Sequence, residues 1–321
     1  MSSSGKWQLG KGYFSGLISG RNRRRGIRVF CYHGVVERKS DVLLERNLHL
    51  LSDFTDHTAL FRRCRVLTSE ELLHELSFPS VEKKPAAVIT FDDGYANNLL
   101  AAEILSRYRM PWIVHISTGF VGQEKAIGAV ELSLLLLHGE ADSVHVLGKE
   151  WPLHNRAERE VAFEGIRVPM KAMPSAIRLK TMAEICSQFP TEETRRLLSV
   201  FPSLQMLSWA EIDQLSASGA VIGSHGVYHE IHHAHQDTEV RLSEMAHSKS
   251  ELEKRLNRPC QCFAYPNGDT VPSSPVEART AGYRLAFAAI EKTVLVGTDP
   301  YLIPRLKPRT RLVHMGEDLF W

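Results

Sequence analysis

The chain has 321 residues, of which 43% are hydrophobic and 24% are charged, and its formal net charge is +2. This is the composition of a globular protein that can bury a large core without help from disulfides. The small net charge excludes nucleic acid as an expected partner. The five cysteines are an odd number without a repeated C-x-x-C pattern, which argues against a disulfide framework and against a zinc ribbon. In apolar strand-like runs, Cys31, Cys260 and Cys262 are expected to act as small buried hydrophobes.

Arginines cluster near the start of the chain, in the run RNRRRGIR at residues 21–28. Such a run is typical of a solvated arm, and the alternative is weak contact with an anionic membrane surface. We therefore expect residues 1–26 to form a basic N-terminal arm. The start of the chain lacks the apolar core of a signal peptide, and no run reaches the ~20 apolar residues of a membrane span. The expected location is the cytoplasm, with the inner membrane face as the alternative.

From residue 27 onward, apolar runs alternate with helical patterns. Strands are expected at RVFCYHGV (28–35), AAVITF (86–91), WIVHIS (112–117), AVIGSH (220–225), QCFAYP (261–266) and RLAFAAI (284–290). Helices are expected at 68–76, 99–105, 208–219, 242–256 and 274–283. Two of these helices begin with the spacing of a capping box, formed by Thr68 with Glu71 and by Ser208 with Glu211.

This alternation predicts an α/β fold in which helices cover a parallel sheet, and a barrel-like arrangement fits the length. Between about residues 123 and 207 the alternation stops and the pattern becomes mostly helical. We interpret that span as a helical insertion in a single catalytic domain at 27–321.

Polar residues that directly follow strands meet at the carboxyl end of a parallel sheet. The first such group is TFDDGY, which contains Asp92 and Asp93. Two adjacent carboxylates point in different directions, so one can bind a metal while the other stays free as a base. The alternative is an ordinary Asp-Gly turn.

The second group is SHGVYHEIHHAH, which contains His225 and His229. One helical turn would place these two imidazoles on the same face, and their spacing suits a metal such as zinc. The alternative is an exposed, histidine-rich polar loop. That alternative is our interpretation of His232, His233 and His235.

The third group is FAYPNGD at residues 263–269, which is either a plain turn or the wall of a groove.

Asp93, His225 and His229 together form a set of two histidines and one carboxylate. A metal held by such a set can polarise a carbonyl and lower the pKa of a water molecule. Asp92 is placed to take a proton, and a leaving amine needs an acid on the opposite side. The set predicts hydrolysis of an amide or ester.

These motifs resemble the NodB-type polysaccharide deacetylases, carbohydrate esterase family 4. TFDDG resembles the first motif of that family, in which the first aspartate is the base and the second binds the metal. SHGVYH resembles the second motif, with Gly226 where serine or threonine is usual. The resemblance extends from residue 28 to roughly residue 310, and the central insertion matches poorly.

The third motif resembles a subgroup, the poly-N-acetylglucosamine deacetylases. Ala264 stands where many family members have arginine, and FAYPNG is similar to the subgroup's form. In that subgroup a short YH strand comes first and its histidine is the general acid, which implies this role for His33. Alone, His33 would be a satisfied histidine at a strand end. A recurring segment matches IPRL, which implies that Arg305 orients Asp92. The implied substrate-binding residues are Tyr265, Pro266 and Asn267, with a backbone N–H near Asn267 holding the oxyanion.

The resemblance implies a distorted (β/α) barrel and a metal-dependent hydrolase. The expected reaction removes an N-acetyl group from an amino sugar in an oligosaccharide, a polysaccharide or a glycan precursor. The expected metal is zinc, with cobalt, nickel and iron as alternatives. Because fold does not settle function, two alternatives stay open. One is hydrolysis of another C–N bond, such as an N-formyl group or a ureide, and the other is a non-catalytic carbohydrate-binding relative. The family's aspartate–tryptophan fourth motif is not evident.

Overall fold

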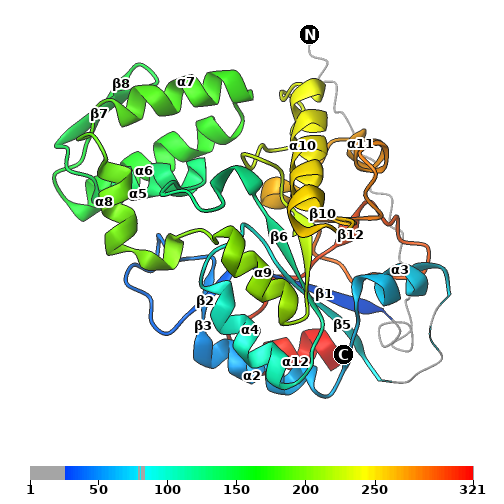
Figure 1. The fold of residues 1–321 in the computed structure, drawn as a ribbon. Helices are drawn as coiled ribbons and strands as arrows, with labels where there is room; N and C mark the ends of the chain where they lie inside the picture. The colour runs from blue at the N-terminus through cyan, green and yellow to red at the C-terminus, as the bar shows by residue number, and fades with distance from the viewer. Residues whose placement is uncertain (1–25, 79, 81–83, 321) are drawn as a thin grey trace, which may run out of the picture.

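A computed structural model describes residues 26–78, 80 and 84–320 of the chain, so the predicted basic arm lies outside the described residues except for Gly26. Parallel strands form the centre of the molecule, in the spatial order β1-β5-β6-β9-β10-β11-β12 (Figure 1). Their bounds are β1 (Ile27–Tyr32), β5 (Ala86–Phe91), β6 (Trp112–Ile116), β9 (Ala220–Ser224), β10 (Cys262–Ala264), β11 (Leu285–Ala288) and β12 (Ile303–Pro304). A short strand, β4 (Arg65–Val66), pairs with β5 beside this series.

The two ends of this series of strands meet. Leu306, two residues after β12, forms a parallel bridge with Phe30 of β1. The Cys31 N–H donates to the Leu306 carbonyl at 3.0 Å, and the Leu306 N–H donates to the Val29 carbonyl at 2.7 Å. The sheet is therefore nearly closed, and the predicted distorted (β/α) barrel is confirmed. The strands read as continuous apolar runs because helices cover the outside of the barrel.

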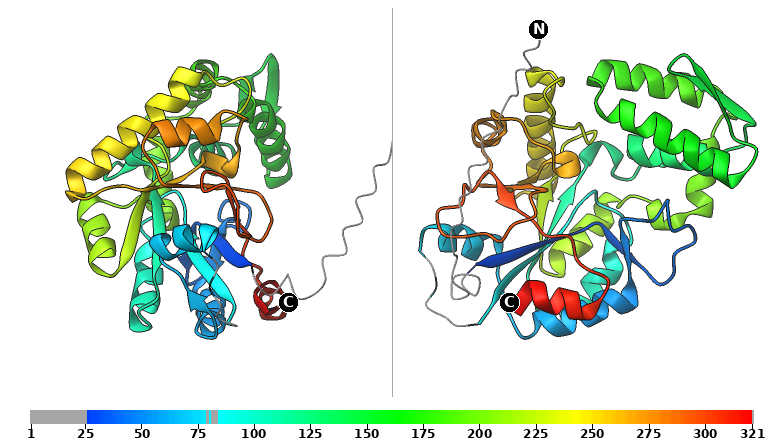
Figure 2. Two further views of the ribbon diagram at one scale, coloured as in Figure 1. Left: turned by 90° about the vertical axis from the view of Figure 1, so that its right-hand side faces the viewer. Right: turned by 180° about the vertical axis from the view of Figure 1, so that it is seen from behind.

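Helices surround the barrel on several sides (Figures 1 and 2). They are α2 (Leu51–Phe61), α3 (Ser69–Ser77), α4 (Asn98–Arg107), α9 (Trp209–Ala217), α10 (Thr238–Leu256), α11 (Ser274–Thr280) and α12 (Leu312–Phe320). Both predicted capping boxes are present, at the start of α3 and of α9. The strand predicted at 28–35 is divided at His33 into β1 and a short strand, β2 (Gly34–Val36), which pairs with β3 (Leu48–Leu50). The strand β3 and the helices α2 and α12 were not expected from the sequence.

Aromatic rings fill the core between β1, β5 and β6. Phe91 at the end of β5 stacks on Tyr32 with ring centroids 5.1 Å apart, and it meets Trp112 edge-on at 5.2 Å. All three side chains are buried. Burying each such side chain contributes about 1.5–3 kcal/mol to stability. This packing fixes the end of β5, where the paired aspartates follow.

The segment predicted as a helical insertion forms a separate lobe beside the barrel, drawn in green in Figure 1. It contains α5 (Gly128–His138), α6 (Arg156–Lys171), α7 (Ser175–Cys186) and α8 (Glu193–Val200). It also contains an antiparallel hairpin of β7 (Ser143–Val146) and β8 (Lys149–Pro152), which the sequence analysis did not predict. The hairpin turn places Leu147 at φ 57° and Gly148 at φ 71°. Because leucine rarely adopts a positive φ, this turn has no recognisable sequence signature.

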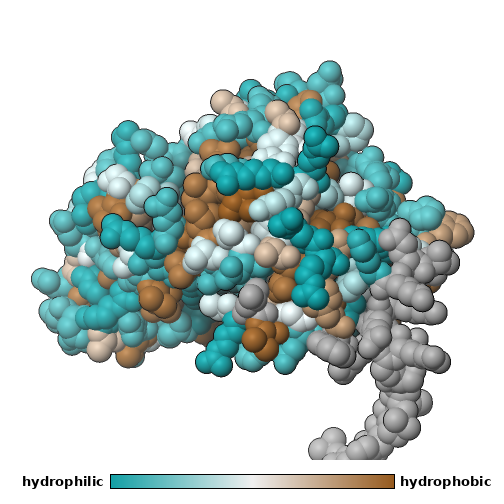
Figure 3. Space-filling model, turned by 90° about the horizontal axis from the view of Figure 1, so that it is seen from below, coloured by the Kyte–Doolittle hydropathy of each residue, from teal (hydrophilic) through white to brown (hydrophobic). Residues whose placement is uncertain are grey.

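Hydrophilic side chains cover most of the face in Figure 3, and apolar side chains lie between them in several groups. No helix among the described residues is both long enough and apolar enough to cross a membrane.

Candidate metal and catalytic site

Polar side chains gather at the carboxyl end of the barrel, because several strands end there. His33 follows β1, Asp92 and Asp93 follow β5, His225 follows β9, and Arg305 follows β12. The structure therefore brings together the candidate base, acid, arginine and metal ligands that the sequence analysis named.

Asp93 and the two histidines of the second motif converge on one point. One oxygen of Asp93, Oδ1, lies 3.3 Å from Nε2 of His225 and 3.5 Å from Nε2 of His229. The prediction that a helical turn aligns these histidines is wrong, because residues 225–229 form a bent loop. Gly226 at φ 80° and His229 at φ 59° make the bends that turn both imidazoles toward Asp93.

The orientation of the His225 ring suits a metal ligand. Its Nδ1 lies 2.8 Å from the Ala264 carbonyl, which only accepts, so Nδ1 carries a proton. A neutral His225 then presents the lone pair of Nε2 to the Asp93 carboxylate. A cation must lie between two such lone pairs. In the metal-free chain a proton on Nε2 can take this place, because burial works to lower the pKa of His225 but Asp92 and Asp93 raise it. A metal would replace that proton, and metal-ligating histidines are commonly held through their other nitrogen in this way. The residues present thus fit a divalent metal.

Asp92 faces a different set of partners. Nη1 of Arg305 lies 2.7 Å from Oδ1, and Nη2 lies 2.7 Å from Oδ2. Burial works to raise the pKa of Asp92, but Arg305, together with His225 and His115, holds it well below its usual range. Asp92 is therefore ionised although it is buried, because its hydrogen-bonding and charged partners stabilise the carboxylate form.

His33 lies at the mouth of the barrel, half-buried, beside Asp92. A ring nitrogen of His33, an oxygen of Asp92 and the Cys31 sulfur all lie within 4.8 Å of one another. The amide of Asn98, on α4, donates to the His33 carbonyl at 2.8 Å and so holds the backbone at this point. The His33 ring therefore lies close to the carboxylate of the candidate base, Asp92.

Two neighbours of Asp92 were not predicted as site residues. His115, in the interior of β6, is fully buried and its Nδ1 lies 2.9 Å from Oδ1 of Asp92. A Cβ at Gly223 would lie 2.6 Å from Cδ2 of His115, so the glycine makes room for this ring. The thiol of Cys31 donates to Oδ2 of Asp92 at 3.4 Å, and so it is more than a small apolar filler. Nothing in the sequence indicated that His115 is more than a packing residue, because it lies within an apolar strand.

Comparison with known proteins identifies the family. Residues 80–286 match the family model for polysaccharide deacetylase. The chain belongs to the polysaccharide deacetylase family. This confirms the family that the motifs predicted.

Solved structures of polysaccharide deacetylases and related enzymes share the fold. The structure is similar to IcaB from Ammonifex degensii, with 17% identity and a TM-score of 0.60, over 92% of this chain and 98% of that chain. It is also similar to the Streptococcus pyogenes deacetylase PplD in complex with acetate, with 16% identity and a TM-score of 0.59, over 92% and 98% of the two chains. For BC0361, a polysaccharide deacetylase from Bacillus cereus, the identity is 15%, the TM-score is 0.57 and the coverage is 92% and 69%. The search of curated proteins found no match.

In this member of the polysaccharide deacetylase family, the third motif divides between core and surface. The Tyr265 ring is fully buried, and its hydroxyl lies 3.1 Å from the Ser274 carbonyl and 3.0 Å from the Tyr301 carbonyl. The structure therefore gives Tyr265 a packing role in place of the predicted substrate contact. Pro266 is also buried. Asn267 is exposed at φ 58°, and its amide donates to Asp269 at 2.6 Å, so it alone of the three faces solvent.

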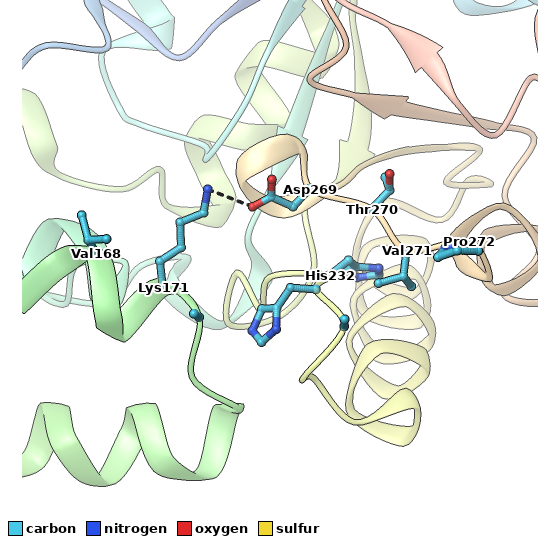
Figure 4. A pocket seen from close by; sticks show the side chains of 10 residues that line it. Val168, Lys171, His232, Asp269, Thr270, Val271 and Pro272 are labelled. Carbon is cyan, nitrogen blue, oxygen red and sulfur yellow. Dashed lines mark ion pairs between the residues drawn. The ribbon is translucent and has the colours of Figure 1, made fainter. Parts of the chain in front are cut away.

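A hollow of about 430 Å³ lies between the end of α6 and the loops that follow β9 and β10 (Figure 4). Lys171 and Asp269 form an ion pair across it at 3.0 Å. His232 lines the hollow, although its ring is buried against those of Phe263 and Tyr265. The expectation that His232 belongs to an exposed loop is therefore corrected.

Proposed function

We propose that this chain is a metal-dependent N-deacetylase, which removes the acetyl group of an amino sugar in an oligosaccharide, a polysaccharide or a glycan precursor. The observation that carries the proposal is the convergence of Asp93, His225 and His229 beside the buried, ionised Asp92. A carbohydrate-binding module has little use for a carboxylate base next to such a set of metal ligands. Family membership supports an N-acetylated sugar as the substrate.

Asp93, His225 and His229 would hold the metal. Zinc suits two imidazoles and a carboxylate, and cobalt, nickel and iron accept the same ligands. When bound, a divalent metal at this place would polarise the acyl carbonyl and lower the pKa of a water molecule.

The chain's own side chains would manage the protons. Asp92 takes a proton from the attacking water as the water oxygen forms its bond to the acyl carbon. Arg305 and His115 hold the Asp92 carboxylate in place for this transfer. His33 then donates a proton to the nitrogen as the C–N bond breaks, and the products are acetate and a free amine. A backbone N–H near Asn267 would stabilise the negative oxygen of the tetrahedral intermediate.

The direct test is acetate release from a panel of N-acetylated amino sugars of increasing chain length. We expect release that stops after the metal is stripped by a chelator and returns when zinc or cobalt is added back. Matched N-formyl sugars, assayed for formate, test whether the acyl group is acetyl. Full activity in the stripped protein would rule out metal dependence, and turnover of the formyl series alone would rule out the deacetylase.

A second test concerns His33. We expect His33→Ala to keep its metal, because His33 lies outside the ligand set, and to lose about 10²- to 10⁴-fold in turnover. Bound metal is measured by elemental analysis, and turnover by acetate release. His74→Ala, on the surface helix α3, is the matched control. A near-normal rate in His33→Ala would remove the general-acid assignment.

A further inference from the structure

The loop that carries both candidate metal histidines has no regular secondary structure, so it needs another source of rigidity. Glu244, a buried residue of α10, provides it. Its Oε2 accepts the backbone N–H groups of Val227 at 2.9 Å, Tyr228 at 2.8 Å and Glu230 at 3.4 Å. One carboxylate oxygen thus gathers three donors from the stretch that begins inside the His-x-x-x-His motif and ends just past it.

These contacts lie on both sides of His229. The donors of Tyr228 and Glu230 flank it, and His229 itself has a φ of 59°, a left-handed conformation that non-glycine residues seldom adopt. Such a conformation persists only where the surroundings hold it. The Glu244 carboxylate is the group placed to hold it here.

Gly226 makes the close approach of the carboxylate possible. A Cβ at this position would lie 2.7 Å from Oε2 of Glu244, which is too close for the carboxylate to stay where it is. Glu244 can therefore approach the loop this closely because residue 226 has no side chain.

We propose that Glu244 is a positioning residue of the metal site, whose carboxylate fixes the bend that brings His225 and His229 to the same oxygen of Asp93. This inference rests on the proposed metal-dependent function. Glu244 does not contact either imidazole; it acts through the backbone between them and after them. Without it, the loop relaxes away from the left-handed bend at His229 and the two nitrogens no longer share one point.

A second anchor makes the proposal testable in a folded protein. The side chain of Glu230 is bound by Arg178 of α7 and by Gln236, whose Nε2 lies 2.7 Å from Oε2 of Glu230. The far end of the loop therefore stays attached when Glu244 is changed. Loss of Glu244 frees the bend and leaves the segment in place.

The experiment compares Glu244→Leu, which removes the acceptor, with Glu244→Gln, which keeps an acceptor oxygen without the charge. Glu239→Ala, an exposed glutamate at the start of the same helix, is the control. The Kd for Zn²⁺ is measured by competition with a chromophoric chelator, and the visible spectrum of bound Co²⁺ reports ligand geometry. Measurements are made at pH 8, because burial raises the pKa of Glu244 to about 7. Thermal unfolding of each metal-free variant checks the fold.

We expect Glu244→Leu to weaken Zn²⁺ binding about 10- to 100-fold and to change the Co²⁺ spectrum. Glu244→Gln should lose less than Glu244→Leu, and Glu239→Ala should match the wild type. Wild-type affinity and spectrum in Glu244→Leu would overturn the proposal, as would equal losses in the Leu and Gln variants. These readouts do not require turnover. A chain whose zinc affinity depends on Glu244 but that releases no acetate would therefore contradict the proposed function alone.

Discussion

Asp92 and Asp93 are neighbours in sequence but have different surroundings. Asp93 has a φ of 74°, which turns its carboxylate to the two histidines, while Asp92 turns to Arg305 and His115. Burial works to raise the pKa of Asp93, but His225, with His33 and His229, lowers it to about 2. Both carboxylates are therefore ionised at neutral pH, and each is available for a separate task.

We predict that Asp92→Asn keeps its metal and loses about 10²- to 10⁴-fold in turnover, because asparagine preserves the shape but cannot take a proton. Metal content and kcat for acetate release are the measurements. Asp93→Asn is the informative partner, since it should lose metal as well. Turnover within a few-fold of wild type in Asp92→Asn would show that another group is the base.

We predict that His115→Leu lowers turnover about tenfold without changing metal affinity, because His115 donates to Asp92 and lies outside the proposed ligand set. A hydrogen bond to the ionised form lowers a carboxyl pKa, so its loss raises the pKa of Asp92. The acidic limb of the pH–rate profile should accordingly move to higher pH. An unchanged limb would mean that His115 only fills space. His115→Asn, which keeps a donor, should stay closer to wild type.

At the scale of elements, the short strand β12 closes the barrel and delivers Arg305. Arg305 is buried and pairs with both oxygens of Asp92, and Nη1 also lies 3.3 Å from the Thr90 hydroxyl of β5. The ion pair therefore joins the last strand of the barrel to β5 across its interior. Removing one partner of such a pair leaves a buried charge without compensation.

We predict that Arg305→Met lowers the free energy of unfolding by about 3–5 kcal/mol, as measured by urea denaturation of the metal-free protein. The double variant Arg305→Met with Asp92→Asn should recover part of this loss, because no unpaired charge remains. Arg309→Met is a suitable control, since its side chain is largely exposed in its ion pair with Asp318. Equal stability of the single and double variants would contradict the buried-pair account.

The elements that could be predicted from sequence are those with a continuous apolar run or a capping box. The strands that end just before Asp92 and His225 could be predicted, because buried parallel strands are apolar throughout and polar residues follow them. β12 has only two residues and no such run. A spacing of four does not separate a helical turn from a bent loop, so the geometry of His225 and His229 was mispredicted. Glu244 resembles any glutamate of an amphipathic helix, because its partners are backbone groups of a distant loop.

At the scale of the whole molecule, the insertion is tied to the barrel through Asp41, which follows β2. Arg156 of α6 donates to Asp41 at 2.5 Å, and His138 of α5 lies 2.9 Å from it. Burial works to raise the pKa of Asp41, but Arg156, together with Leu44 and His138, lowers it below its usual range. The lobe beside the barrel therefore depends on an ionised carboxylate for part of its attachment.

We predict that acid weakens this attachment. A carboxylate whose pKa is depressed in the folded state stabilises the fold above its unfolded pKa, near 4, and loses that contribution as the pH falls further. Wild-type stability should therefore decline between about pH 5 and pH 2, and Asp41→Asn should be less stable at pH 7 with a smaller decline. Denaturant unfolding across this pH range measures both, with Asp142→Asn, an exposed aspartate of the insertion itself, as the control. Parallel curves for wild type and Asp41→Asn would contradict the prediction.

The position of Arg305 in the chain has a consequence for biosynthesis. The ribosome completes Asp92 long before it completes Arg305, and β12 with the Leu306 bridge to β1 forms after the other barrel strands have emerged. Until then, the candidate base has no guanidinium partner and the barrel has an open seam. A nascent or C-terminally truncated chain that ends before residue 303 is therefore without the counter-ion of its own base. The counter-ion of the candidate base and the closure of the barrel therefore arrive together, at the last of the described barrel strands.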